Sequence, residues 1–222
     1  MTRPRVVAID GAAGGGKSTL ARSLAVRLGV PYVNTGLMYR AVTAAALRHG
    51  ASLDDAGALA SLADGLRFTL TNASPPELEV EGYDIATLTT PAVEGSVSAV
   101  ARHRDLRTRL RAVQRTLGET GAVMEGRDIG SVVFPDAPVK LFLAADPGTR
   151  AARRVAERDD AGAGDALHVR DSRDARTTAL EPVGDAHVID TTERDAAAVL
   201  ADALAIVARE ASDVFPGPGT AT

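Results

Sequence analysis

The chain has 222 residues, of which 45% are hydrophobic, enough for one sizeable core or one core with a small insertion, so we expect a single domain. A net charge of −4 and an aromatic content of 3% argue against nucleic-acid binding. The lack of cysteine excludes disulfides and thiolate metal sites, and four scattered histidines suggest no zinc site. Because no apolar run reaches the roughly 18 residues of a membrane span and no signal-peptide pattern precedes the first strand, we expect a cytoplasmic protein without a membrane partner.

A glycine-rich loop directly follows the first predicted strand, the apolar run of residues 6–9. The loop fits the phosphate-binding pattern G-x-x-x-x-G-K-[ST] at every fixed position. Such a turn before a helix points backbone N–H groups at phosphate oxygens, and its lysine and hydroxyl suit the β- and γ-phosphates and Mg²⁺. We therefore expect a nucleoside triphosphate to bind at Gly11, Ala12, Ala13, Gly14, Gly15, Gly16, Lys17, Ser18 and Thr19, with Ser18 as the metal ligand.

The segments that follow alternate between helical and strand patterns. Residues 19–28 repeat apolar side chains at helical spacing and stop at Gly29, a helix-ending residue. Further short apolar runs at residues 32–33, 122–125, 139–143 and 187–189 predict strands. The alternation is typical of an α/β fold with a doubly wound five-stranded parallel sheet, in which ligands bind beyond the carboxyl ends of the strands.

Between residues 54 and about 91 the pattern changes. Residues 67–70 and 78–81 alternate apolar and polar side chains on either side of a turn-forming stretch at 72–76, which predicts a small antiparallel insertion. Residues 93–117 are then compatible with helix, with a break near His103. The last residues, about 212–222, have the composition of a disordered end.

A second motif, EGRDIG, begins at the end of the strand at 122–125. It places Arg127 and Asp128 at the edge of the sheet that also carries the phosphate loop. There an arginine can meet an anionic acceptor, and an aspartate can accept hydrogen bonds from a base or a sugar. Taken alone, the pair is also compatible with a surface ion pair worth about 0–1 kcal/mol.

Taken together, residues 11–19, 34–40, 100–115 and 125–140 resemble bacterial cytidylate kinases, from the first strand to about Thr192. The resemblance implies a nucleoside-monophosphate-kinase domain of the P-loop NTPase type. It also implies an inserted monophosphate-binding subdomain at about residues 54–115 and an arginine-bearing lid at about residues 150–176. Three departures stand out: Ala12 replaces a common proline, Thr89 replaces a common arginine, and the lid is shorter than usual.

The resemblance also implies roles for individual residues. Thr35 and Asp128 match positions near cytosine, and Arg40, Arg107 and Arg127 match arginines that bind the acceptor phosphate. The full set of expected substrate-binding residues is Thr35, Tyr39, Arg40, Arg107, Arg127, Asp128, Arg170, Asp174 and Arg176, with Arg173 as the alternative to Arg176. The expected catalytic residues are Lys17, Arg127, Arg153 and Arg170, and Arg150 and Arg154 flank Arg153 at near-helical spacing.

The implied reaction is direct in-line transfer of the γ-phosphoryl group of ATP to CMP or dCMP, with Mg²⁺ arriving with the nucleotide. The family analogy implies a monomer. A kinase acting on another nucleoside monophosphate or small acceptor stays open as the alternative. A GTP-dependent switch is disfavoured because the chain has no Asn-Lys pair with which to build its guanine-reading motif.

Overall fold

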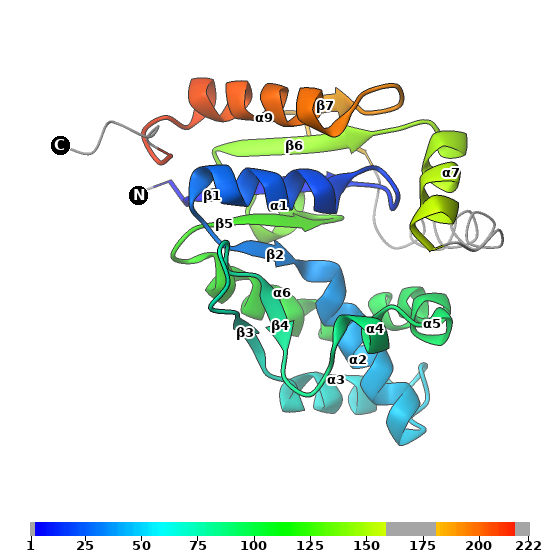
Figure 1. Cartoon of the computed structure of the whole chain (residues 1–222). Coiled ribbons are helices and arrows are strands. Elements are labelled where there is room, and N and C mark those ends of the chain that lie inside the picture. Colours follow the sequence, from blue (N-terminus) through cyan, green and yellow to red (C-terminus); the bar gives the residue numbers. More distant parts are fainter. Residues whose placement is uncertain (1–2, 159–180, 216–222) are drawn as a thin grey trace.

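The computed structural model describes residues 3–158 and 181–215 (Figure 1). Over these residues it has a five-stranded parallel sheet with the order β2-β5-β1-β6-β7. The strands are β1 (Val6–Gly11), β2 (Tyr32–Asn34), β5 (Ala122–Gly126), β6 (Val139–Ala144) and β7 (His187–Asp190). The predicted doubly wound sheet is confirmed, and each strand runs one or two residues beyond its predicted carboxyl end.

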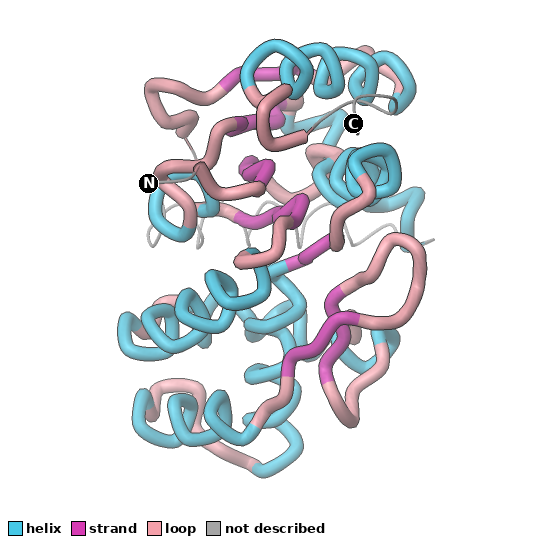
Figure 2. Tube along the Cα trace, turned by 90° about the vertical axis from the view of Figure 1, so that its left-hand side faces the viewer, coloured by secondary structure: helices cyan, strands magenta, loops and turns pink. Residues whose placement is uncertain are grey.

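Helices cover both faces of the sheet, and β1 shows why. Its side chains alternate between faces: Val7 and Ile9 join one apolar core, whereas Val6 and Ala8 join the other. The first core contains α1 (Lys17–Leu28) and α9 (Ala196–Glu210), and the second contains α2 (Thr35–His49) and α6 (Arg104–Gly118) (Figures 1 and 2). The strands are therefore buried on both sides, as expected of a parallel sheet.

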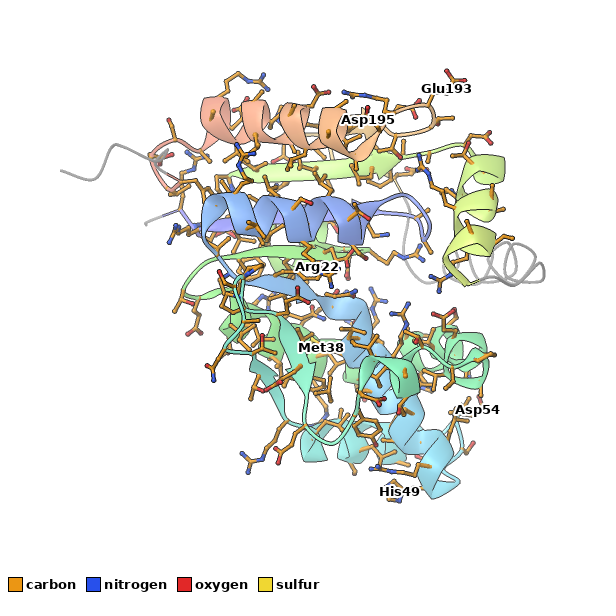
Figure 3. All side chains as sticks on the ribbon, viewed as in Figure 1. Arg22, Met38, His49, Asp54, Glu193 and Asp195 are labelled. Atoms are coloured by element: carbon orange, nitrogen blue, oxygen red, sulfur yellow. The ribbon has the colours of Figure 1, made fainter. Side chains whose placement is uncertain are left out.

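The segment between α2 and α6 holds the predicted antiparallel pair. Strands β3 (Phe68–Leu70) and β4 (Leu78–Val80) pair with Phe68 opposite Val80. Helix α3 (Ala56–Gly65) precedes this pair in the chain, and α4 (Ile85–Leu88) and α5 (Pro91–Ala101) follow it. The Arg22 side chain of α1 (Figure 3) meets the start of β4 through two bonds to Glu77, at 2.7 and 3.0 Å. The boundaries proposed for the insertion stay predictions.

The predicted helix at residues 93–117 is two helices. The first ends at Ala101 and the second begins at Arg104, so the break lies at the predicted place. His103 Nε2 lies 2.8 Å from the Leu53 carbonyl oxygen, a contact that ties the break to the loop between α2 and α3. On the second helix, Arg107 and Arg111 bond Asp128, which lies just beyond the carboxyl end of β5.

Two predicted regions fall partly outside the described residues. Helix α7 (Pro147–Arg158) forms the start of the proposed lid, whereas residues 159–180 lie outside the description. At the other end, Phe215 is buried in the core with α9, so the chain is packed up to this residue. Residues 216–222 of the tail expected to be disordered lie outside the description, and that expectation stays a prediction for them. Along the described ranges, no helix combines the length and the apolar character needed to cross a bilayer.

Candidate active site

A cavity of about 250 Å³ opens at the carboxyl ends of β1, β2 and β5. Twelve of the site residues predicted from the sequence line it: Ala13, Gly14, Gly16, Lys17, Ser18, Thr19, Thr35, Tyr39, Arg40, Arg107, Arg127 and Asp128. Residues that sequence reasoning did not assign also line it: Asn34, Gly36, Thr89, Glu94, Val97, Ser98, Ala101, Glu125, Gly126 and Arg154. The phosphate loop and the Arg127–Asp128 pair thus share one cavity.

The phosphate loop has the backbone that its glycines allow. Gly14 and Gly16 have φ values of 73° and 85°, in the left-handed region that suits glycine. A Cβ on Gly14 would lie 2.8 Å from the Arg150 carbonyl oxygen, so a side chain has no room there. Helix α1 starts at Lys17 without a side-chain cap, which leaves its first N–H groups directed at the loop. Lys17 Nζ donates to the Ala12 carbonyl oxygen at 2.7 Å.

An acidic group lies beside the predicted metal ligand. Ser18 Oγ donates to Glu125 Oε1 at 2.7 Å, and Tyr32 OH donates to the same oxygen at 2.5 Å. Burial, together with the Glu125 carboxylate, raises the pKa of Tyr32 above its usual range, so the phenol stays a proton donor. Sequence reasoning missed Glu125, although an acid after the apolar residues Ala122–Met124 of a buried strand was a usable signal.

The oxygen donors of this corner fit a magnesium ion. Mg²⁺ prefers hard oxygen ligands and is usually held by one or two protein groups together with substrate phosphates. Within the described ranges, no three histidine, cysteine or acidic side chains form a metal-binding cluster. Ser18 and Glu125 therefore suit an ion that brings phosphate oxygens as its other ligands.

At the other end of the cavity, Asp128 is buried between two arginines. Its Oδ2 accepts from Arg107 Nη2 at 2.8 Å and from Arg111 Nη2 at 2.7 Å. Arg111 was missed by the sequence analysis, although it lies four residues after Arg107 and so on the same face of α6.

Two further predicted residues of the cavity lie on helix α2. Burial raises the pKa of Tyr39 to about 12, so its phenol stays protonated at neutral pH. Thr35 Oγ1 donates to the Glu125 carbonyl oxygen at 2.8 Å.

An acidic residue also joins helix α2 to helix α7. Glu94 on α5 accepts from Arg154 Nη2 at 2.6 and 2.8 Å, and Arg40 Nη2 lies 3.5 Å from the same carboxylate. These side chains are 13–20% exposed, so the ion pairs are partly shielded from water. Glu94 was not predicted because nothing in the local pattern distinguishes it from a surface acid.

Arg153, predicted to be catalytic, is not among the residues that line the cavity. Its guanidinium donates to Thr191 Oγ1 at 3.1 Å and to the Thr191 carbonyl oxygen at 2.5 Å, at the loop after β7. Arg154, its neighbour, lines the cavity instead. Helical spacing could not choose between them, because the choice depends on how α7 packs. Four further candidates from the sequence lie outside the described residues: Arg170, Asp174, Arg176 and the alternative Arg173.

Known proteins match this chain over most of its length. The family model described as cytidylate kinase matches residues 7–209. The cytidylate kinase of Streptomyces avermitilis is 40% identical over 198 residues, covering 85% of this chain and 86% of that protein. The cytidylate kinase of Exiguobacterium sibiricum is 42% identical over 199 residues, covering 84% and 89%.

Longer relatives match as well. A protein of Prochlorococcus marinus named bifunctional pantoate ligase/cytidylate kinase is 43% identical over 166 residues, covering 73% of this chain and 34% of that protein. The present chain therefore spans about a third of the length of these bifunctional relatives. The family model and the two relatives of similar length lead to one conclusion: this chain belongs to the cytidylate kinase family.

Proposed function

We propose that this chain transfers the γ-phosphoryl group of ATP to CMP and dCMP, which yields CDP and dCDP. The observation that carries the proposal is that a phosphate loop and arginines from four separate segments line one cavity. These are Arg40 on α2, Arg107 on α6, Arg127 after β5 and Arg154 on α7. Membership of the cytidylate kinase family supports this reading.

The donor end would hold the triphosphate through backbone N–H groups of the loop and through Lys17, which has to leave the Ala12 carbonyl to reach the β- and γ-phosphates. Ser18 and Glu125 would hold Mg²⁺, and the bound ion would neutralise part of the phosphate charge. Transfer requires no strong base, because the acceptor phosphate is already largely ionised at neutral pH. Catalysis then comes from positioning and charge neutralisation by Lys17 and the arginines.

The acceptor end would select cytosine through Asp128. A carboxylate accepts a hydrogen bond from the amino group of cytosine. Uracil has a carbonyl oxygen at the corresponding position, and two acceptor oxygens facing each other form no hydrogen bond and repel. Two arginines hold this carboxylate through one oxygen, Oδ2, which fixes its orientation. Three statements stay expectations. They are a monomeric state, a cytoplasmic location, and contributions to the site from the lid residues Arg170, Asp174 and Arg176.

A coupled ADP-release assay with ATP and Mg²⁺ tests the proposal. CMP, dCMP, UMP, AMP and GMP are compared as acceptors, with a control that lacks any acceptor. We expect turnover with CMP and dCMP well above the others. Turnover only with another acceptor would favour the alternative kinase, and equal ADP release without acceptor would reject the phosphotransfer reading.

A further inference from the structure

The residues expected to contact the acceptor precede an unusual turn. Arg127 and Asp128 lead into η1 (Ile129–Val133), a π-helical segment of one turn. Val132 N and Val133 N donate to the Asp128 carbonyl oxygen at 2.9 and 3.2 Å. A single turn closes few hydrogen bonds for the backbone freedom it fixes, so it has little stability of its own. Side chains from outside have to hold it.

The N–H end of this turn is held by Asp10. Its Oδ1 accepts from Ile129 N and its Oδ2 from Gly130 N, both at 2.8 Å. A two-oxygen carboxylate matches two neighbouring N–H groups, and its negative charge suits the positive end of a helical turn. Burial raises the pKa of Asp10, although these two bonds act in the opposite direction. Asp10 is the β1 residue directly before Gly11, the first residue of the phosphate loop.

The carbonyl end of the turn is held by Arg115. Its Nε donates to the Val133 carbonyl oxygen at 3.0 Å and its Nη2 donates to the Val132 carbonyl oxygen at 2.9 Å. The fixed fork of the guanidinium matches two neighbouring carbonyl groups, and its charge suits the negative end of the turn. Arg115 lies on α6, the helix that also supplies Arg107 and Arg111 to Asp128.

We propose that Asp10 and Arg115 are positioning residues for the acceptor: from opposite ends they hold the turn that sets Arg127 and Asp128 in register with the phosphate loop. The proposal rests on the proposed function for the role of Arg127 and Asp128. Neither side chain is expected to touch a substrate. Asp10 belongs to the strand that leads into the phosphate loop, and its carboxylate bonds the backbone of the turn that follows Arg127 and Asp128. It therefore links the loop expected to bind the donor to the residues expected to bind the acceptor.

Two conservative variants test this proposal. In Asp10→Asn, the amide group replaces one acceptor oxygen and faces an N–H group that it cannot satisfy. In Arg115→Lys, the charge stays but the fork is lost, so a single ammonium replaces two directed donors. Since a hydrogen bond to a charged group is lost each time, we expect the KM for CMP to rise about ten-fold in each. We expect kcat and the KM for ATP to change less than about three-fold, because the phosphate loop keeps its own contacts.

A matched control comes from the same helix. Arg109 is paired with Asp64 at an exposed site, where both side chains are about half exposed, so Arg109→Lys should leave both KM values unchanged. In the double variant the rise in KM should be smaller than the product of the single rises, because both residues hold one turn. Calorimetric titration with CMP alone gives the same comparison without turnover.

The outcomes separate this inference from the function beneath it. If the unmodified protein prefers another acceptor, the proposed function fails, and the KM for that acceptor then tests the positioning role. Folded Asp10→Asn and Arg115→Lys proteins with an unchanged acceptor KM would overturn the inference. So would an equal rise in the KM for ATP, since that result would indicate a general loss of structure. If Asp10→Asn does not fold, Arg115→Lys decides alone.

Discussion

Replacing Asp128 with asparagine removes one charge from a buried group of three and keeps its shape. The side chains of Asp128, Arg107 and Arg111 are 11%, 13% and 22% exposed, and both arginines bond the same carboxylate oxygen. Removing one partner of a fully buried ion pair costs about 3–5 kcal/mol. Because these groups keep some contact with water, we expect about 2–3 kcal/mol, a fall in Tm of roughly 4–12 °C for a chain of this size.

The same change should alter substrate choice. An asparagine at residue 128 can present its amide N–H to the uracil carbonyl, so the ratio of kcat/KM for CMP to that for UMP should fall. Thermal unfolding followed by circular dichroism measures the first effect, and initial rates with both acceptors measure the second. A folded Asp128→Asn protein with an unchanged Tm and an unchanged CMP/UMP ratio would contradict both roles assigned to this carboxylate.

Asp64→Asn is the matched control, because Asp64 also pairs with an arginine of α6. Its side chain is 57% exposed and that of Arg109 is 48% exposed. An exposed pair is worth about 0–1 kcal/mol, so Tm should fall by no more than roughly 4 °C. An equal loss in both variants would mean that burial does not set the strength of the pair at Asp128.

Further predictions follow from three contacts and from one open position. Lys17→Ala should lower kcat by about 10²–10³-fold through lost charge stabilisation, with an unchanged circular dichroism spectrum; near-normal turnover would contradict this role. Gly126→Ala should cost about 1–3 kcal/mol, because its Cβ would lie 2.7 Å from a hydroxyl oxygen and from a methyl carbon. Gly65→Ala, with no atom within 4 Å, should instead stabilise helix α3 by about 0.5–1 kcal/mol in urea unfolding. Lys140 donates to Asp185 and lowers the pKa of this carboxyl in the folded protein. The ionised carboxylate therefore stabilises the fold at pH values above the pKa of the unfolded chain, and this stabilisation is lost as the pH falls through the lowered pKa of the folded protein. The difference in unfolding free energy between the natural protein and Asp185→Asn should therefore shrink between pH 7 and about pH 3; a constant difference would refute the pairing.

The sheet could be predicted from the sequence because its strands are short apolar runs separated by helical patterns. What the patterns missed were the last strand residues, such as Asp10, Asn34 and Gly126. Asn34 and Gly126 line the cavity and Asp10 bonds the turn after β5, so none of them continues the apolar pattern of its strand. The break at His103 was also readable, because the apolar periodicity of the helix is interrupted there.

The site was only partly readable, since its charges pair across elements. The phosphate loop and the Arg127–Asp128 pair are local motifs. By contrast, the partnership of Glu94 with Arg154 joins residues 60 positions apart, and that of Ser18 with Glu125 joins residues 107 apart. No local pattern carries such a pairing, which is a property of the folded chain.

The most direct test of the account follows the transferred group itself. ATP labelled at the γ-phosphate is mixed with CMP, Mg²⁺ and the purified protein, and the products are separated by chromatography, with a parallel reaction that contains UMP. We predict that the label appears in the β-phosphate of CDP, much faster than in UDP. Release of the label only as inorganic phosphate, or equal labelling of CDP and UDP, would contradict the account of a cytosine-selective acceptor site.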